Sequence, residues 1–275
     1  MDKIYINQSL VKDLIKYQND EICGLVLTNK WVLKQFGSGT KSNNLGHYFE
    51  YLCTGALAKG ETEPPKPEYT KKGELTSEFQ SAKEQAVFFH DLIRKLNISL
   101  ISAGDKVLAD DKWIGTLDIL AEWKDFEKFS GIQYDFTNNP ERKVIIDLKY
   151  SGLLDDKWSE FGWNTDTLAK KKGTMLQAKH YKFLFWKKYG YNPPFLFFVF
   201  DTKEYGKVKI IHVDIEDWEL EQHEQFLEKA KKYFDYQLEK GFQPKPKYEF
   251  CMKCKYSKFC QFKIETPSII TIKPE

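Results

Sequence analysis

The sequence contains no uninterrupted run of about 20 apolar residues, the length that a helix needs to cross a bilayer. The first residues, Met1 to Tyr5, also lack the apolar segment of a secretory signal peptide. No internal repeat is visible along the chain. We therefore expect a cytoplasmic protein that has no contact with a membrane.

An excess of charge of either sign is also missing. The chain has 42 Lys and Arg against 40 Asp and Glu, which leaves a formal net charge of +2. A surface for a nucleic acid must therefore be a local patch, because the chain as a whole is not basic. The 21 Phe and 15 Tyr are expected mainly in the core, although some could stack on bases.

Cysteine is scarce, with five residues in 275. In a reducing compartment a few cysteines are metal ligands or core residues more often than disulfide partners. A chain of this length can form one large domain with appendages or two small domains.

The order of the expected elements indicates an α/β sandwich around a mixed sheet. Apolar spacing and capping signals predict helices over 9–17, 45–57, 74–96, 174–189 and 216–241. Apolar or alternating runs predict strands over 106–108, 113–120, 144–150, 194–201 and 207–214. The almost wholly apolar 194–201 run should be central in the sheet, and the alternating 207–214 run nearer its edge. Residues 61–73, with three prolines, predict an exposed insertion.

The strand from Val144 to Tyr150 carries the main functional signal. The β-branched run Val144-Ile-Ile is typical of a buried strand, and Asp147 and Lys149 follow it. Residues two apart share one face of a strand, so this carboxylate and this ammonium lie side by side. Charges at the end of an apolar strand cost free energy unless they pair or bind something.

A second apolar strand, Thr116 to Leu120, contains one carboxylate, Asp118. Two acids on neighbouring strands repel each other unless a cation lies between them. With Lys149 beside them, the acids form an oxygen-ligand site for a hard metal ion, next to an ammonium. These groups are suited to phosphodiester hydrolysis.

The pattern Ile114-Gly-Thr-Leu-Asp118 followed by Ile146-Asp-Leu-Lys149 resembles the PD-(D/E)XK nuclease superfamily. Gln177 and Tyr181 are similar to the Gln-x-x-x-Tyr helix motif of its RecB-like exonuclease branch. The resemblance implies a restriction-endonuclease-like core with a central mixed β-sheet flanked by helices. The order of the motifs is more specific than any one of them.

In this resemblance Asp118 and Asp147 bind one or two Mg²⁺ or Mn²⁺ ions, which prefer carboxylate and water oxygens. The backbone carbonyl of Leu148 completes the metal shell. Lys149 either activates the attacking water or neutralises charge on the phosphate. Glu50 is expected as the third acid, and His47, three residues earlier, is the alternative ligand because many relatives have a histidine there.

The helix that carries Gln177 and Tyr181 is implied to lie over the active site, where both side chains touch metal-bound water or phosphate. The two residues are four apart and share a helix face. The nearby lysines are expected to bind the DNA backbone, and they are Lys170, Lys171, Lys172 and Lys179.

The C-terminal segment has a Cys-x2-Cys-x5-Cys cluster, formed by Cys251, Cys254 and Cys260. Three thiolates within ten residues can reach one metal centre and need a fourth from elsewhere. The layout resembles iron–sulfur RecB-like nucleases, including CRISPR-associated and AddAB-type enzymes, which implies a 4Fe–4S cluster that ties the chain ends together. Cys23 is the expected fourth ligand, Cys53 is its competitor, and zinc is the alternative metal.

The sequence thus predicts a nuclease domain over 1–241 and a metal-cluster tail over 242–275 that packs on the N-terminal helix. The expected activity is Mg- or Mn-dependent DNA hydrolysis, most simply by an exonuclease on single strands or DNA ends in recombination, repair or phage DNA processing. One alternative is a structure-specific or restriction-type endonuclease. Another is a non-cleaving DNA-binding subunit that assembles with a helicase or recombination partner.

Overall fold

The computed structural model describes residues 4–35, 41–57, 61–152, 154 and 175–266. The chain forms two compact units, of which the smaller contains Met1–Ser38 and Phe226–Glu275 and the larger contains Gly39–Gln225. Helix α7 (Asp217–Lys240) begins in the larger unit and ends in the smaller one. The units therefore divide the chain at residues 38 and 225, whereas composition suggested a single boundary near residue 241.

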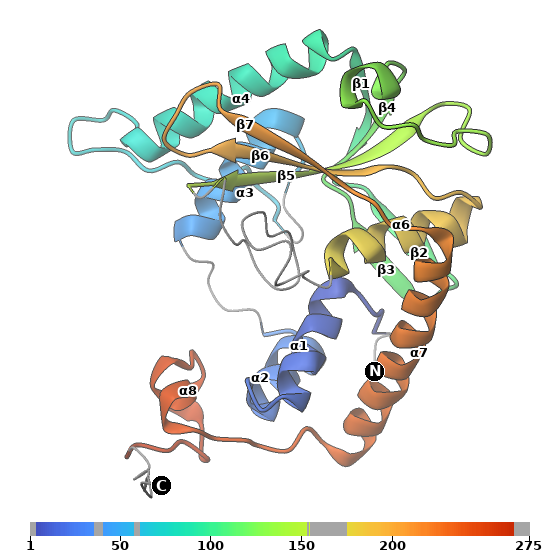
Figure 1. The fold of residues 1–275 in the computed structure, drawn as a ribbon. Helices are drawn as coiled ribbons and strands as arrows, with labels where there is room; N and C mark the ends of the chain where they lie inside the picture. The colour runs from blue at the N-terminus through green and yellow to red at the C-terminus, as the bar shows by residue number, and fades with distance from the viewer. Residues whose placement is uncertain (1–3, 36–40, 58–60, 153, 155–174, 267–275) are drawn as a thin grey trace, which may run out of the picture. The chain divides into compact units, whose positions relative to one another are not determined.

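The larger unit is built on a five-stranded mixed sheet (Figure 1). Its strands, in spatial order, are β1 (Ile98–Ala103), β4 (Ile119–Trp123), β5 (Lys143–Ser151), β6 (Phe195–Asp201) and β7 (Val208–Val213). Only the β5–β6 pair is parallel, and the other three pairs are antiparallel. The expected α/β fold with a mixed central sheet and flanking helices is confirmed.

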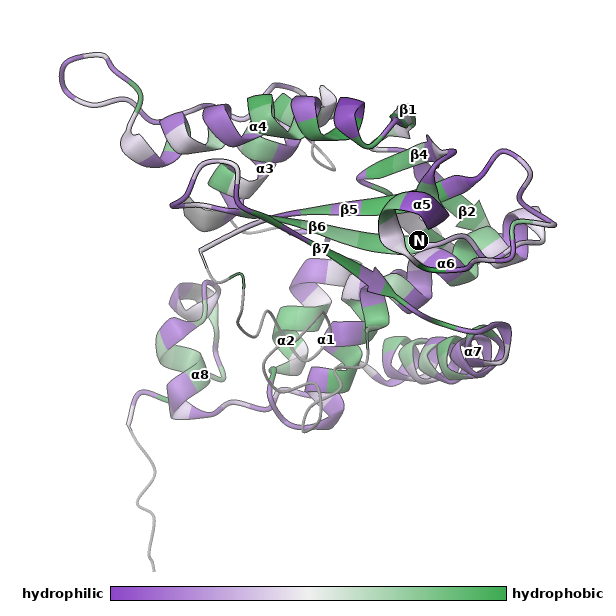
Figure 2. Cartoon of the chain, turned by 45° about the horizontal axis from the view of Figure 1, so that its top comes forward, coloured by the Kyte–Doolittle hydropathy of each residue, from purple (hydrophilic) through white to green (hydrophobic). Residues whose placement is uncertain are grey.

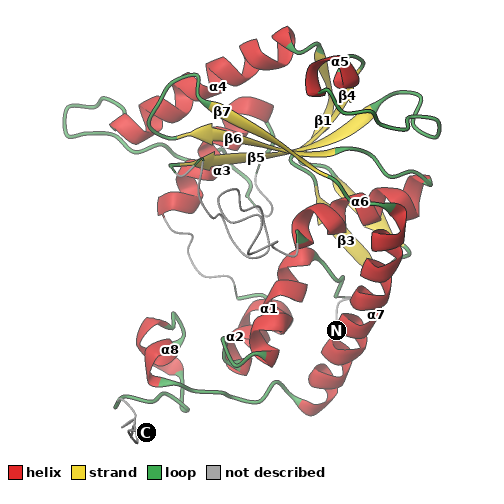
Figure 3. Cartoon of the chain, in the orientation of Figure 1, coloured by secondary structure: helices red, strands yellow, loops and turns green. Residues whose placement is uncertain are grey.

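Helices cover both faces of this sheet (Figure 3). Even-numbered residues of β5 and β6, such as Ile146 and Phe198, join an apolar core with helices α3 (Lys41–Thr54) and α4 (Ser77–Lys95). Odd-numbered residues face helix α6 (Leu176–Tyr189), and the ring of Phe195 lies 6.2 Å from that of Tyr181. The face of Asp147 and Lys149 is therefore the α6 face.

The apolar composition of β6 matches its place in the sheet (Figure 2). All seven of its residues are buried, and it lies between β5 and β7. Strand β7 is at the edge, as its alternating pattern predicts.

The expected continuous strand from Trp113 to Leu120 is wrong. The chain bends at Leu117 and Asp118. Before the bend, β3 (Trp113–Thr116) pairs with β2 (Lys106–Ala109) in a separate two-stranded sheet, and after it β4 enters the main sheet. Strand β1, which sequence patterning missed, pairs with β4. A short helix, α5 (Phe126–Ser130), was also not expected.

The smaller unit brings the two ends of the sequence together. It contains α1 (Gln8–Gln18), α2 (Gly24–Leu27), the π-helix η1 (Thr28–Val32), α8 (Tyr248–Lys253) and the 3₁₀ helix η2 (Ser257–Phe259). The ring of Tyr17 lies edge-on to Phe242 at 5.6 Å, and its hydroxyl accepts a hydrogen bond from Gln243 N at 3.1 Å. The N-cap of α1 is Asn7, whose Oδ1 accepts a hydrogen bond from Leu10 N.

Among the helices of the part of the chain that the structure describes, none has the length and apolar character to span a membrane.

Candidate active site

Strand β5 presents Asp147 and Lys149 on the α6 face of the sheet. The two side chains form an ion pair. The Asp147 side chain is only 1% exposed and that of Lys149 is 17% exposed, so the pair lies at the border of the core. The Lys149 ammonium is also 5.9 Å from the centre of the Phe197 ring on β6. The strand thus places this charged pair at the edge of the apolar core.

Asp118 lies at the bend between β3 and β4. Its Oδ2 accepts a hydrogen bond of 2.9 Å from the backbone N–H of Leu148. The regular pairing of β4 with β5 ends one step earlier, at Ile119 and Ile146. The Asp118 carboxylate therefore accepts the hydrogen bond that a backbone carbonyl of a paired strand would accept. This bond positions it beside the Asp147–Lys149 pair.

Glu50, on α3, is the third acid of the site. Burial, together with the charges of Asp118 and Asp147, raises the pKa of Glu50 to about 8, although Lys149 opposes the shift. Burial and the Asp118 charge likewise raise the pKa of Asp147 to about 7. Burial also raises the pKa of Asp118. Three mutually repelling carboxyls thus surround one ammonium.

Lys149 is the cation that these acids hold in the structure. Burial alone would lower its pKa, but the charges of Asp147, Asp118 and Glu50 outweigh burial and raise it. Its Nζ also donates to the Leu148 carbonyl at 3.3 Å. Carboxylates and a backbone carbonyl thus already converge on a positive charge.

The same donors suit a hard divalent cation. Oδ1 of Asp147 is fully buried and forms the ion pair with Lys149. This oxygen, Asp118, Glu50 and the Leu148 carbonyl are the groups that fit such an ion. In the described side-chain positions, no three His, Cys, Asp or Glu groups already form a metal-holding cluster.

The two residues of the Gln-x-x-x-Tyr motif lie in different surroundings. The Gln177 amide donates a hydrogen bond to Oδ2 of Asp147. Tyr181 is 6% exposed, and its ring packs against Phe195 and Gly115, where an added Cβ would come within 2.8 Å of it. Gln177 therefore reaches Asp147, and the Tyr181 ring packs between α6 and the strands.

The other site residues expected from sequence divide into three groups. Exposed His47 is close enough to Asp118 for its charge to lower the pKa of that acid, so it stays an alternative to Glu50. Lys179 forms a 3.1 Å ion pair with Glu219. Lys170, Lys171 and Lys172 lie outside the described residues.

Sequence reasoning also missed two lysines of this unit, one buried on α6 and one on the sheet face of Lys149. Lys182 on α6 is fully buried, and Lys209 on β7 lies on the same sheet face as Lys149. The alternation of Lys207-Val-Lys209 was the only available signal for the second, and no local pattern marked the first.

The smaller unit contains a cavity of about 540 Å³ lined by four cysteines. These are Cys23, Cys251, Cys254 and Cys260. Backbone N–H groups approach two of the sulfurs, Lys245 N to Cys23 Sγ at 3.3 Å and Ile264 N to Cys251 Sγ at 3.5 Å. Thiols on one cavity with N–H···S contacts fit a thiolate-bound metal centre.

Cys53 has a different environment. It is 2% exposed within the apolar core of the larger unit, and burial and the Glu50 charge raise the pKa of its thiol. A buried, protonated thiol is a poor metal ligand.

No family model matches the chain, and no curated protein sequence matches it. Among solved structures, the chain is similar to a "putative exonuclease" from Eubacterium rectale, with a TM-score of 0.60 and 20% sequence identity. The match covers 96% of this chain and 91% of that chain. The likeness shows that the two proteins share a fold.

Proposed function

We propose that this protein is a metal-dependent nuclease that hydrolyses phosphodiester bonds in DNA. The observation that carries the proposal is the arrangement of Asp118, Asp147 and Glu50 around Lys149 at the edge of a buried sheet. Burying several acids together lowers the stability of the fold, and a purely structural role would not require it. The similarity in fold to a protein described as a "putative exonuclease" supports the same proposal.

In this proposal the three acids and the Leu148 carbonyl hold Mg²⁺ or Mn²⁺. The bound ion supplies a water of lowered pKa and stabilises charge on the phosphate. Gln177, which donates to Asp147, keeps that carboxylate oriented toward the site.

Lys149 stabilises negative charge and does not act as a base. The surrounding carboxyls raise the pKa of its ammonium, which favours the protonated form. A fixed ammonium beside the scissile phosphate stabilises the charge that develops there during hydrolysis.

We further infer that the cysteine cavity holds a 4Fe–4S cluster through Cys23, Cys251, Cys254 and Cys260. The shared cavity and the N–H···S contacts support the cluster, and zinc on the same thiolates is the alternative. Cys23 and the other three ligands come from opposite ends of the sequence. The metal centre would therefore cross-link the two ends of the chain within the smaller unit.

The preferred substrate is a single strand or a DNA end, by analogy with the exonuclease fold and the sequence resemblance. A structure-specific or restriction-type endonuclease would instead cut covalently closed circular DNA. A non-cleaving subunit would bind DNA, cut neither substrate, and depend on a helicase or recombination partner.

The test is cleavage of end-labelled oligonucleotides by anaerobically purified protein, with Mg²⁺, with Mn²⁺ and with EDTA. We expect metal-dependent products that begin at an end of the substrate and are absent for Asp147→Asn. DNA binding without cleavage under either metal would overturn the enzymatic proposal.

A further inference from the structure

The two units of the chain carry opposite formal charges. The smaller unit has 16 lysines against 10 Asp and Glu, a formal charge of +6. The larger unit has 26 Lys and Arg against 30 Asp and Glu, a formal charge of −4. The net charge of +2 for the whole chain is therefore the balance of a basic unit and an acidic one. Such an asymmetry is typical of a protein that binds a polyanion through one of its parts.

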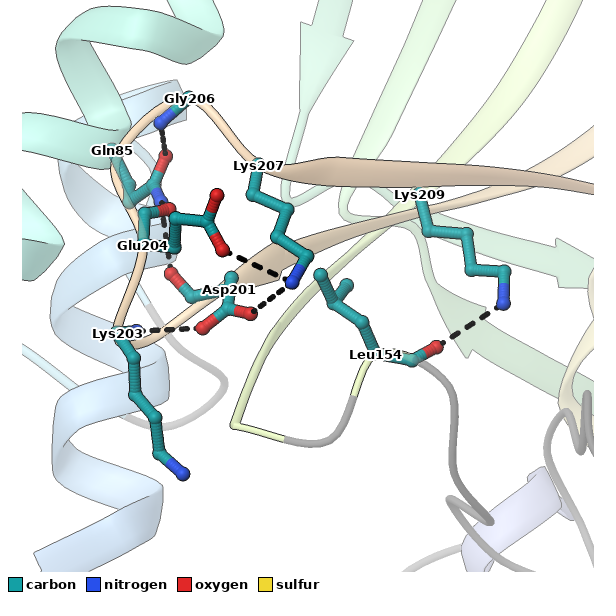
Figure 4. A network of polar contacts seen from close by, with 8 residues as sticks. All are labelled: Gln85, Leu154, Asp201, Lys203, Glu204, Gly206, Lys207 and Lys209. Carbon is teal, nitrogen blue, oxygen red and sulfur yellow. Dashed lines mark hydrogen bonds and ion pairs between the residues drawn. The ribbon is translucent and has the colours of Figure 1, made fainter.

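In the larger unit, lysines beside the sheet contact groups of the unit itself. Lys207, just before β7, forms ion pairs with Glu204 at 3.1 Å and with Asp201 at 3.8 Å, in the turn that joins β6 to β7 (Figure 4). Lys209 on β7 donates a hydrogen bond of 3.4 Å to the carbonyl of Leu154 (Figure 4). These ammonium groups are therefore occupied within the fold.

The basic character of the smaller unit is concentrated in residues 245–263, which contain six lysines and one acid. Three of the six also serve the fold. Lys245 forms an ion pair with Asp20, and Nζ of Lys247 donates to the carbonyl of Asp20 at 2.8 Å. Lys263 forms an ion pair of 2.8 Å with an acid two residues away.

The other three lysines of this segment, Lys253, Lys255 and Lys258, are exposed. None of them forms an ion pair with an acid in the part of the chain that the structure describes. Nζ of Lys255 lies 5.0 Å from the centre of the Tyr256 ring. The hydroxyl of Tyr256 donates to the carbonyl of Gln35 at 2.5 Å, which fixes the segment to the N-terminal part of the unit. The three ammonium groups thus face solvent on an anchored segment.

Two of these lysines lie at the cysteine cavity. Lys253 and Lys255 line it together with Lys263 and Phe262, so these four side chains surround one opening. Two acids also line the cavity, and the lysines outnumber them there. Phe262 is 41% exposed, and an exposed aromatic ring beside ammonium groups is a surface on which a base can stack. Lys258 is not among the described residues that line the cavity, so the charge of a bound metal centre gives no reason for it.

We propose that Lys253, Lys255 and Lys258 form a docking surface for the backbone of a single DNA strand, which we call the lysine patch. The inference rests on the proposed function and adds that the substrate is held by a different unit from the one that carries the acids of the candidate active site. An acidic unit repels a polyanion, so the basic unit has to provide the long-range attraction. Lysines contact successive phosphates as point charges without reading the sequence, and stacking on Phe262 favours unpaired bases.

The test compares triple variants of the full chain. The patch variant replaces the three lysines of the lysine patch by Gln. The control variant replaces three exposed lysines of the larger unit, none of which forms an ion pair with a described residue, and they are Lys83, Lys95 and Lys188. Both variants lose three positive charges, so a difference between them reports the position of the charge and not its total. A third variant with Arg at the three patch positions keeps the charge.

Binding of a fluorescein-labelled oligodeoxythymidine is measured by anisotropy at several salt concentrations without added divalent metal, and cleavage is measured with Mn²⁺. The iron and zinc content of each protein is determined alongside, because two residues of the lysine patch flank Cys254. The single variant Lys258→Gln is included because it leaves the lining of the cavity unchanged.

For the patch variant we expect Kd to rise roughly 30- to 100-fold near 0.1 M salt. The slope of log Kd against log salt should fall by about 2, since each phosphate contact on a single strand contributes about 0.7. KM should rise by a similar factor, and kcat should change less. Lys258→Gln alone should lower the slope by about 0.7 at full metal content. The Arg variant and the control variant should match the wild type.

Equal Kd and slope in the patch and control variants would overturn the inference, while metal-dependent cleavage by the wild type would still support the nuclease. Weak binding that accompanies loss of metal and is not restored by Arg would assign the lysines to the metal centre instead. Retained DNA binding with lost binding to polyglutamate or to phosphatidylserine vesicles would assign the patch to an acidic protein or a lipid surface, which also overturns the inference. If the wild type neither binds nor cuts DNA, the proposed function itself fails.

Discussion

The carboxylate of Asp118 accepts a hydrogen bond from the backbone N–H of Leu148, the residue between Asp147 and Lys149. This bond joins the two sequence motifs, because it holds the acid of one against the strand of the other. It also uses only one oxygen of Asp118, so the carboxylate has a further oxygen for a cation. The same contact thus orders the bend and positions a ligand.

Asp147→Asn should remove activity and raise stability. The loss of a metal-binding charge should lower cleavage by about a thousandfold or more. The metal-free variant should unfold at a higher urea concentration than the wild type, because a carboxyl whose charged form is disfavoured by burial has been replaced by a neutral amide. Activity assays and urea unfolding in EDTA measure the two effects. Asp91→Asn on exposed α4 is the control, and equal activity in the two variants would contradict the site.

Metal binding should become tighter as pH rises from about 6 to 8. The folded pKa values of about 7 for Asp147 and about 8 for Glu50 lie above their ordinary values, so a proton must leave before an ion can bind. In EDTA, the stability that the protonated acids contribute is full below pH about 4 and is lost as pH rises to about 8. The increase in Tm on addition of Mg²⁺ should therefore be larger at pH 8 than at pH 6. An increase that is independent of pH would rule out coupling between these acids and the metal.

Lys182→Met should stabilise the protein at neutral pH. Lys182 is fully buried, its Nζ makes no hydrogen bond among the described residues, and burial lowers its pKa from 10.5 to about 8 despite nearby Asp214 and Asp217. Its protonation in the folded state costs roughly 3 kcal/mol at pH 7, and this cost disappears as pH rises from about 8 to 10.5. Urea unfolding should show a gain that shrinks toward pH 10. Lys188→Met, exposed on the same helix, should show no such trend.

Cys23→Ser should empty the proposed metal centre, whereas Cys53→Ser should not. Cys23 lines the cavity of the three C-terminal cysteines, and Cys53 packs in the core of the larger unit. We expect roughly four irons per chain and a brown colour in anaerobically purified wild type and in Cys53→Ser. Elemental analysis distinguishes the two metals. If it finds zinc and no iron, the centre is a zinc site and not an iron–sulfur cluster. Full iron content in Cys23→Ser would exclude that residue as a ligand.

Gly24→Ala should loosen the smaller unit. A Cβ at Gly24 would lie 2.2 Å from the carbonyl oxygen of Gln243, a backbone atom that cannot rotate away. Displacement of this segment would also break its hydrogen bond with the Tyr17 hydroxyl. We expect a loss of about 1–3 kcal/mol in unfolding free energy and faster proteolysis near Lys245. Gly46→Ala, where nothing lies within 4 Å of the added atom, is the control and should not be destabilised.

Local patterns in the sequence were sufficient for the features that depend on periodicity. The alternation of a strand placed Asp147 and Lys149 on one face, and the unbroken apolar run of residues 195–200 made β6 a central strand. The order of helices and strands predicted the α/β fold. These features are decided by side chains close together in the chain, so they can be read from composition and spacing.

Only the tertiary structure decided which distant groups meet. The bend at Asp118 depends on a bond to Leu148 in another strand, and the strand pattern of 113–120 gave no sign of it. The Tyr181 ring contacts Gly115 on β3, and Gln177, four residues earlier, donates a hydrogen bond to Asp147 on β5, so α6 joins two different strands. The position of Lys209 in line with Lys149 follows from the register of three strands. Register and packing are set by contacts between segments far apart in the chain, and no local pattern encodes them.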